Sequence, residues 1–353
     1  MKKLCLAILM IATLLSCSLP VLALDMGGYL ENKFQALDGQ NIVETNKLKL
    51  DFKLKTDNYY FFASLTGYND FLDPDNSFLE IGRAYLELYP SWGKATIGQQ
   101  NIAWGYGYLF NLPDQFNLPN PLDPKGEKDG INAVSVKWNI TETSLFQAVM
   151  IPAIPPGVSQ AKLAGIDYGV KGLWNMGRFD IGIYGIKKTI TLVDDPLTSA
   201  YIYIDRRAAV LELKGELGDD LPGVLAQGGW FHDIQYPGGI ETAYISSIYG
   251  ADYTFALGNG LYLLAEYLQN GKMSNNQLYF LTRYSANSYA TLSLSGLWDL
   301  QTSNALYSLM LKYQLNDNVE LTAMANYYPQ GSGNIGLNYS CNSDIVIGVK
   351  TSF

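Results

Sequence analysis

Apolar and polar residues alternate one by one along many segments of this chain, and this pattern constrains the fold more than any other feature. Leu48, Leu50 and Phe52 are apolar, and one lysine and one aspartate separate them. A period of two places successive side chains on opposite faces of a strand. A helix with one apolar side would need a period near 3.6. We therefore predict a strand over 47–55 with one apolar and one polar face.

The second half of the chain repeats this alternation with more apolar weight. The clearest segments are 249–255, 290–298, 307–313 and 319–327. Two of them carry tyrosines on both sides of their apolar row, which is typical of strands whose ends meet the aromatic girdles of a membrane. Charged residues make up only 16% of the chain, against about 25% in soluble domains. The outward faces of these strands are therefore expected to contact lipid.

Turn-forming segments separate the predicted strands. Residues 217–220, 257–260 and 315–318 are rich in Gly, Asn and Asp, as tight turns require. Longer polar connections such as 233–239 alternate with them, which is typical of barrels. A spanning strand needs roughly 9–11 residues, and its connections bring this to about 18–20. We predict an all-β fold, a transmembrane antiparallel β-barrel of about 18 strands with 16 as the alternative, and such barrels leave an aqueous channel.

The first 23 residues have the layout of a signal peptide. Two lysines precede an apolar run, and a small-residue cleavage site ends at Ala23. We predict cleavage after Ala23, which leaves 24–353 as the barrel. The segment 14–17 also resembles a lipoprotein box, so lipidation of Cys17 stays open.

The last strand-like segment ends on an aromatic residue. Ile345, Ile347 and Val349 share one face with Phe353, the last residue of the sequence. Here the chain resembles outer-membrane barrels, whose final strand commonly ends in Phe and is recognised by the barrel-assembly machinery. Together with a signal peptide, this resemblance predicts a location in the outer membrane of a diderm bacterium. Membrane lipid and the assembly machinery are the expected partners.

Composition argues against several classes of function. The formal net charge is −9 and no basic cluster is present, so nucleic-acid binding is not expected. The one histidine, His232, and the scattered acids give no metal-ligand spacing. Asp233 follows His232 in a strand-like segment and points to the opposite face, so the two side chains do not form a catalytic pair. We expect no enzyme activity, no metal and no cofactor.

Residues 101–130 interrupt the rhythm of strands. The segment contains four prolines, which lack the N–H that a central strand needs. Its aromatic residues, which include Trp104, Tyr106, Phe110 and Phe116, argue against disorder because they need a surface on which to pack. A loop this long is usually functional. We predict that it folds into the lumen and narrows it, and a loop that caps the mouth of the barrel is the alternative.

The start of this loop also carries a family resemblance. The residues concerned are Gly98, Gln99, Gln100, Trp104, Gly105, Asn111, Pro113, Asn117, Pro119, Asp123 and Pro124. They resemble a fingerprint of poorly characterised porin-like outer-membrane proteins, including relatives of alginate-export-type barrels. In that pattern Gly-Arg-Gln precedes Trp-Gly and then Asn-Pro and Asp-Pro pairs, and Gln99 stands where Arg is usual. The resemblance implies a porin-like barrel.

Charged side chains on the predicted inner faces and in the long loop are the candidates for pore lining. They are Lys47, Lys49, Lys53, Lys55, Arg83, Asp114, Asp123, Glu127 and Asp129. A basic wall that faces an acidic loop would create a transverse field at the constriction. Two other interpretations stay open. The lumen charges form a solvated lining, or Lys125 and Lys128 neutralise the loop acids locally.

These features together predict a pore in the outer membrane for the passive diffusion of small polar or charged solutes. A sealed or gated barrel in adhesion, envelope assembly or polysaccharide export has the same strand pattern and is the alternative. Apolar outward faces suit lipid and a neighbouring subunit equally, so the sequence does not determine the oligomeric state.

Overall fold

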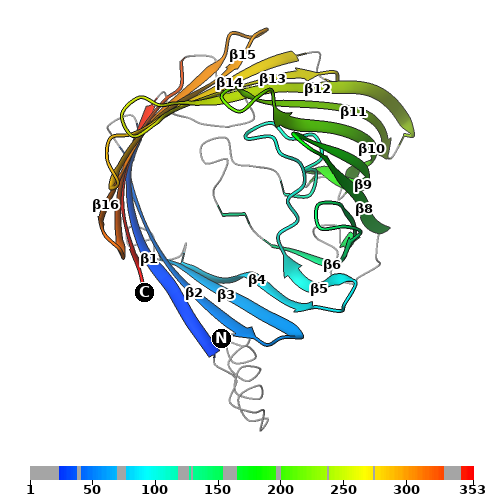
Figure 1. Ribbon diagram of the computed structural model, residues 1–353, viewed down its shortest axis with the longest axis horizontal. Helices are drawn as coiled ribbons and strands as arrows, with labels where there is room; N and C mark the ends of the chain where they lie inside the picture. Colours follow the sequence, from blue (N-terminus) through cyan, green and yellow to red (C-terminus); the bar gives the residue numbers. More distant parts are fainter. Residues whose placement is uncertain are drawn as a thin grey trace.

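The computed structural model is a closed ring of 18 antiparallel strands around a lumen (Figure 1). Each strand pairs with the next in sequence, and β1 (Leu24–Leu37) also pairs with β18 (Ser343–Ser352), which closes the ring. This confirms the predicted all-β barrel and its strand number. The structure describes residues 24–37, 41–69, 77–117, 127–128, 130–153, 165–195, 200–236, 238–272, 275–329 and 343–353.

The remaining strands differ in length, and β9 and β10 are the longest. Register shifts interrupt the β3–β4, β9–β10 and β16–β17 pairings. Within the described ranges, no helix is long and apolar enough to cross a membrane. The bounds are β2 (Asn41–Lys55), β3 (Tyr59–Asn69), β4 (Phe78–Leu88), β5 (Gly93–Gln100), β6 (Ile131–Asn139), β7 (Leu145–Ala153), β8 (Gly165–Met176), β9 (Phe179–Asp195), β10 (Ala200–Glu216), β11 (Gly223–Tyr236), β12 (Ile240–Phe255), β13 (Leu261–Asn270), β14 (Asn275–Ser285), β15 (Ala290–Asp299), β16 (Ala305–Asn316) and β17 (Val319–Tyr327).

The pairing register decides which face of each strand lies toward the lumen. Lys49 lies opposite Tyr29 of β1 and Thr66 of β3, and directly opposed residues in an antiparallel pair share a face. Lys49 is buried while its neighbour Leu48 is exposed on the outside. The lysines of β2 therefore face inward and its leucines face outward, as the alternation predicts.

Aromatic side chains mark the outer surface where strands end. Tyr307 and Tyr313 bracket Leu309 and Leu311 on the outer face of β16, and the two leucines are exposed. Tyr307 also stacks on Tyr327 of β17, with ring centroids 6.5 Å apart. This layout matches the predicted lipid-facing belt with aromatic girdles.

The structure differs from the sequence-based prediction at one connection and leaves the predicted signal peptide outside its described residues. The predicted connection over 233–239 is wrong, because β11 continues to Tyr236 and β12 begins at Ile240. The strand can carry polar residues there because Asp233 faces the lumen and pairs with cations inside it. The signal peptide over 1–23, including Cys17, lies outside the described residues and stays a prediction.

Candidate functional site: the lumen and its inward loop

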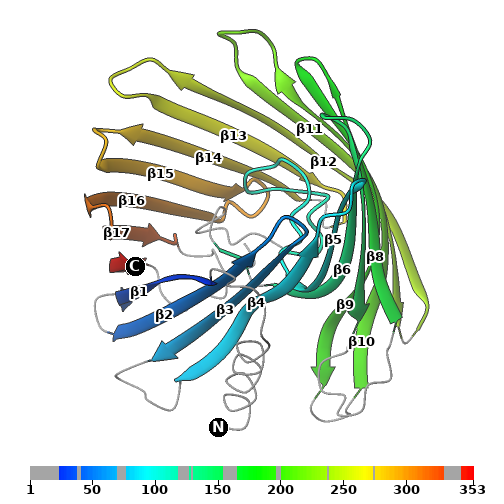
Figure 2. The same ribbon diagram turned by 60° about the horizontal axis from the view of Figure 1, so that its bottom comes forward.

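The long loop after β5 lies inside the ring (Figures 1 and 2). Trp104 is buried and packs against Phe116 and Tyr184, with ring centroids 5.6 and 6.0 Å away. Its indole N–H donates to the side-chain oxygen of Gln147 at 3.1 Å. Tyr184 and Gln147 face inward from β9 and β7, so the loop is docked on the inner wall. For residues 101–117 this confirms the predicted inward fold.

The carboxylate of Glu266 on β13 holds the loop by its backbone. Three consecutive amides donate to it: those of Tyr108, Leu109 and Phe110, the last two at 2.8 and 3.0 Å. Successive N–H groups that converge in this way form a concave site for an anion. Glu266 is only 2% exposed, and a buried carboxylate needs such partners to remain charged.

A second buried acid, Glu212 on β10, anchors the preceding part of the loop. It is 0% exposed and accepts the backbone N–H of Tyr106 at 2.8 Å. The Tyr184 hydroxyl and the Gln227 amide also donate to it, both at 2.5 Å. Gln227 in turn accepts the backbone N–H of Leu112 at 2.8 Å. The loop backbone therefore has specific acceptors on β10, β11 and β13.

Apolar packing accompanies these hydrogen bonds. Ile186, Val210 and Ile248 face the lumen from three strands and form one buried cluster with Leu109 and Phe110 of the loop. The inner wall of a water-filled barrel is usually polar, so the loop covers a surface that water would otherwise wet. Burial of a Leu or Phe side chain contributes about 1.5–3 kcal/mol. This half of the lumen is a dry, packed region.

On the opposite side, the returning end of the loop meets a basic wall. The Glu127 carboxylate contacts the Lys49 ammonium, the Arg83 guanidinium at 2.9 Å and the Tyr29 hydroxyl at 3.3 Å. A cavity of about 230 Å³ opens beside them, with Lys47 also in its lining. Burial acts to raise the pKa of Glu127, but the bond from Lys49 and the charges of Lys49 and Arg83 outweigh it and lower the pKa below its usual value.

Asp114, another loop acid, is directed at its own loop. It is 1% exposed and pairs with the Lys128 ammonium at 2.7 Å. It also accepts the backbone N–H of Asn117 at 3.4 Å. Burial raises the pKa of Asp114, and the ion pair with Lys128 only partly offsets this effect.

The described loop acids therefore do not face the basic wall across open space, as the sequence-based hypothesis of a transverse field requires. Glu127 touches the bases of β2 and β4 directly, and Lys128 neutralises Asp114 within the loop. Asp123 and Asp129 lie outside the described residues. The loop is long enough to reach both walls, and direct contact replaces the gap that a transverse field requires.

The other predicted lysines lie on the inner face of β2. Lys53 is 3.8 Å from Asp25, and register places Lys55 on the same inner face, opposite Tyr60. Lys47 lies over the rings of Tyr29 and Tyr68, within 5.7 Å of their centroids. The set brought together at the cavity is therefore Lys47, Lys49, Arg83 and Glu127. Of the predicted loop aromatics, Trp104, Phe110 and Phe116 pack on the inner wall, and Tyr106 lies under the ammonium of Lys214 at 4.7 Å.

Several further charged side chains also face inward. Arg206 donates two bonds to Asp233, at 2.8 and 3.0 Å, and another to the Gln115 side chain at 3.1 Å. Arg283 donates to the Tyr108 hydroxyl at 3.0 Å. Alternation alone could have placed these side chains inside. The inward bases that were not among the candidates include Lys33, Lys94, Lys137, Lys171, Lys188, Arg206, Lys214, Lys312 and Lys350.

His232 lies apart from these groups. Register places it on the outer face of β11, where it stacks on Trp230 at 5.9 Å and lies 3.3 Å from Glu241. Asp233 faces the lumen, as expected for adjacent residues of a strand. Among the residues that the structure describes, no group of three His, Cys, Asp or Glu side chains could hold a metal ion.

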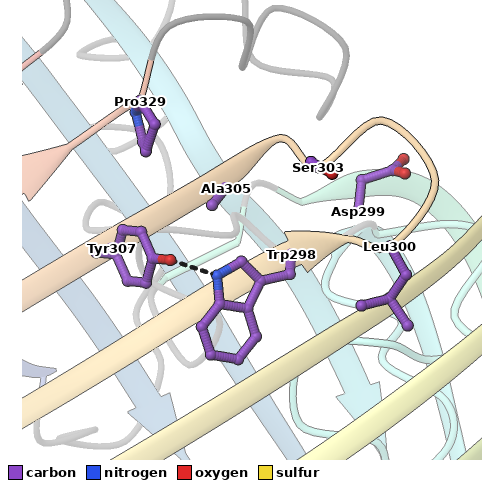
Figure 3. A pocket seen from close by; sticks show the side chains of 7 residues that line it. All are labelled: Trp298, Asp299, Leu300, Ser303, Ala305, Tyr307 and Pro329. Carbon is purple, nitrogen blue, oxygen red and sulfur yellow. Dashed lines mark hydrogen bonds between the residues drawn. The ribbon is translucent and has the colours of Figure 1, made fainter.

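A second depression, of about 430 Å³, lies at the end of β15 and β16 (Figure 3). Trp298 donates its indole N–H to the Tyr307 hydroxyl at 2.5 Å, and both belong to the outer girdle. Asp299 accepts the backbone N–H groups of Gln301 and Thr302, each at 3.0 Å. The polar atoms of Asp299 therefore stabilise the turn, and the depression is a feature of the girdle.

Comparison with known proteins supports the fold. No family model matches the sequence, and no curated protein matches it. Among solved structures, the chain is similar to OccK2 (OpdF) of Pseudomonas aeruginosa, with a TM-score of 0.61, 12% identity, and 93% of this chain and 96% of that chain covered. A mutant of the Rh. blastica porin gives a TM-score of 0.50 at 12% identity, covering 94% of this chain and 100% of that chain. OmpT, an outer membrane protein of Vibrio cholerae, gives 0.50 at 10% identity, covering 94% and 99%.

At these identities the likeness concerns the fold alone. It supports a porin-like barrel, in agreement with the broader part of the resemblance noted in the sequence. It gives no support to the narrower relation to alginate-export-type barrels, which stays a prediction. The chain therefore has a porin-like barrel fold with an inward loop.

Proposed function

We propose that residues 24–353 form an outer-membrane pore through which small polar or charged solutes diffuse passively. The main observation that supports this proposal is that the loop divides the lumen into two parts. One side is filled by loop residues docked on Glu212 and Glu266, and the other retains a charged cavity beside Lys49, Arg83 and Glu127. A narrowed passage lined by fixed charges is what sorting of polar solutes requires.

The proposed site of selection is the contact between loop and wall. Lys47, Lys49 and Arg83 supply positive charge, and Glu127 supplies a negative charge that is 36% exposed. Glu80 also lines the cavity, and Asp51 lies 3.6 Å from Lys49, so three acids stand beside the three bases. We therefore expect only weak ion selectivity at this contact.

The proposal includes export through a cleaved signal peptide over 1–23 and insertion by the barrel-assembly machinery through Phe353. The backbone of Phe353 exchanges two hydrogen bonds of 3.0 Å with Gly28 of β1. This contact supports a role of the last residue in closing the ring. The proposed transport involves no chemistry on the solute, and the outward position of His232 agrees with that.

A sealed barrel in adhesion, assembly or export is the second candidate. It is favoured by the dry packing of the loop against the inner wall, where Ile248 and Tyr184 are fully buried. A lumen closed by such packing would pass no ions. The two functions therefore make opposite predictions for conductance.

The test is planar-bilayer recording of the refolded chain 24–353. Stepwise currents support the pore, and a salt gradient then gives the sign of ion selectivity from the reversal potential. Folded protein with heat-modifiable gel mobility and no current steps would refute the pore and support the sealed barrel. Cation selectivity would show that the lumen acids outweigh Lys47, Lys49 and Arg83.

A further inference from the structure

The outward faces of the described strands carry almost no positive charge. Register and alternation place the lysines and arginines of these strands on the inner face, with two exceptions: Lys187 on β9 and Arg207 on β10. These two residues are direct partners in the β9–β10 register. His232 on β11 is the next partner of Arg207. The outward basic side chains therefore form one row across three neighbouring strands, which we call the basic row.

Aromatic residues show the height of this row on the barrel. Exposed Tyr168 of β8 is the register partner of Lys187. Trp230, two residues from His232, stacks on it with an interplanar angle of 10°. Tyr and Trp collect at the membrane–water interface. A Lys or Arg on the lipid face is much less costly near the interface than at the midplane, so this is the height at which lipid headgroups lie.

The cations of the row retain hydrogen-bonding capacity. The Arg207 side chain is 58% exposed, and its one ion-pair partner among the described residues is Asp205 at 3.7 Å, too long for a hydrogen bond. Lys187 also lies 3.7 Å from Asp205, and its one hydrogen bond within the described part of the chain is a 3.5 Å contact with the Ile166 carbonyl. Asp205 therefore sits between the two cations without occupying their donors. A guanidinium has five such donors in a planar fork that fits phosphate oxygens.

The outer surface next to the row, toward the middle of the membrane, is apolar, and part of it carries only small side chains. The outward residues one step further toward the middle of the barrel are Gly185 on β9, Ala209 on β10 and Trp230 on β11. Small side chains beside an exposed indole leave room for an acyl chain directly below a headgroup bound at the row. Glu241 stands at the edge, 3.3 Å from His232, and adds one negative charge there.

We propose that the basic row, Lys187, Arg207 and His232, binds the phosphate group of a membrane-lipid headgroup on the outside of the barrel. This site is separate from the lumen, so it does not depend on whether the barrel conducts. Lys187 and Arg207 donate to the phosphate oxygens, and the acyl chains lie over Gly185 and Ala209.

The experiment is native mass spectrometry of the refolded chain 24–353 in detergent with added lipid. The probes are lipid A, lipid A without its phosphates, and phosphatidylcholine, with inorganic phosphate as competitor. The chain is expected to retain lipid A and to lose it when the phosphates are removed. Retention of all three lipids to the same extent would overturn the proposal. Full competition by millimolar inorganic phosphate would also overturn it, because the site would then be one for a free anion.

Charge variants locate the binding site. Each Lys or Arg near an anionic headgroup contributes about 1 kcal/mol, so the Lys187→Gln/Arg207→Gln double variant should bind lipid A about thirtyfold more weakly. The matched control is Lys33→Gln/Lys312→Gln, which removes the same charge from the inner face and should bind normally. Asp205→Asn should bind more tightly. Equal binding by the double variant and the control would refute the site, and the exposed single variant Arg207→Gln, expected to bind about fivefold more weakly, replaces the double variant if it fails to fold.

Discussion

Removal of the Glu266 carboxylate should release the inward loop while the barrel stays intact. Glu266→Ala deprives the backbone N–H groups of Tyr108, Leu109 and Phe110 of their acceptor in a buried place. Two of these contacts, those of Leu109 and Phe110, are buried, and each buried N–H without a partner costs about 1–3 kcal/mol, so the change costs about 2–6 kcal/mol. Even the lower end alters the ratio of docked to undocked loop by about thirtyfold. The strand ladder around Glu266 uses only backbone atoms, so the ring should persist.

Single-channel recording and limited trypsin digestion would both report the release. The variant should show larger current fluctuations than the parent protein, and the bond after Lys128 should become accessible to trypsin. Glu320→Gln is the matched control, because Glu320 faces the lumen from β17, 3.8 Å from Lys312, and belongs to a pair away from the anchored loop. Parent-like noise and digestion in Glu266→Ala would refute the anchoring role, provided that heat-modifiable gel mobility shows a folded barrel.

Three further predictions follow from the loop and its contacts. Glu127→Gln should shift the reversal potential toward anion selectivity, because Lys49 and Arg83 lose their counter-charge; an unchanged potential would place Glu127 outside the ion path. The pKa of Glu127 lies below its ordinary 4.5 in the folded protein, so its contribution to loop docking is fully present above that pH and is lost as the pH falls through the lowered value. The difference in selectivity between the parent protein and Glu127→Gln should therefore stay constant from neutral pH down to about 4.5 and vanish only in stronger acid, and a difference already lost near pH 6 would contradict the assignment. Gly169→Ala should disturb the loop, because the new Cβ would lie 2.5 Å from the Trp104 ring, whereas Gly228→Ala, where a Cβ meets nothing within 4 Å, should behave like the parent protein in the same digestion assay.

The faces of the strands could be predicted from the sequence because a strand has a strict period of two. Once Leu48 was assigned to the outside, Lys49 had to lie inside, and the register confirms both. The outward rows that include Leu309 and Ile347 follow in the same way. Connections were harder to place, because polar residues such as Asp233 continue a strand when they face a wet lumen.

The partners of the loop could not be predicted from the sequence. In the sequence, Glu212 and Glu266 have the pattern of ordinary lumen-facing acids. Their role as acceptors for the loop backbone depends on contacts with a segment more than a hundred residues away. One signal was present. The inward positions that include Val210, Ile248 and Leu281 are apolar, which is unusual for a strand that faces water. Apolar residues on both faces of neighbouring strands indicate that something covers the inner one.

The loop is held at its two ends by interactions of different strength. Glu212 and Glu266 are buried, and salt in the medium screens buried groups little. Glu127 is 36% exposed and Arg83 is 26% exposed, so salt reaches this contact more readily than it reaches Glu212 and Glu266, although the Lys49 side chain is buried. Changes of ionic strength and pH should therefore act first on the Glu127 contact and on ion selectivity. The docked half of the loop should remain in place, so we expect the proposed narrowing of the lumen to persist while only the charge at the Glu127 contact changes.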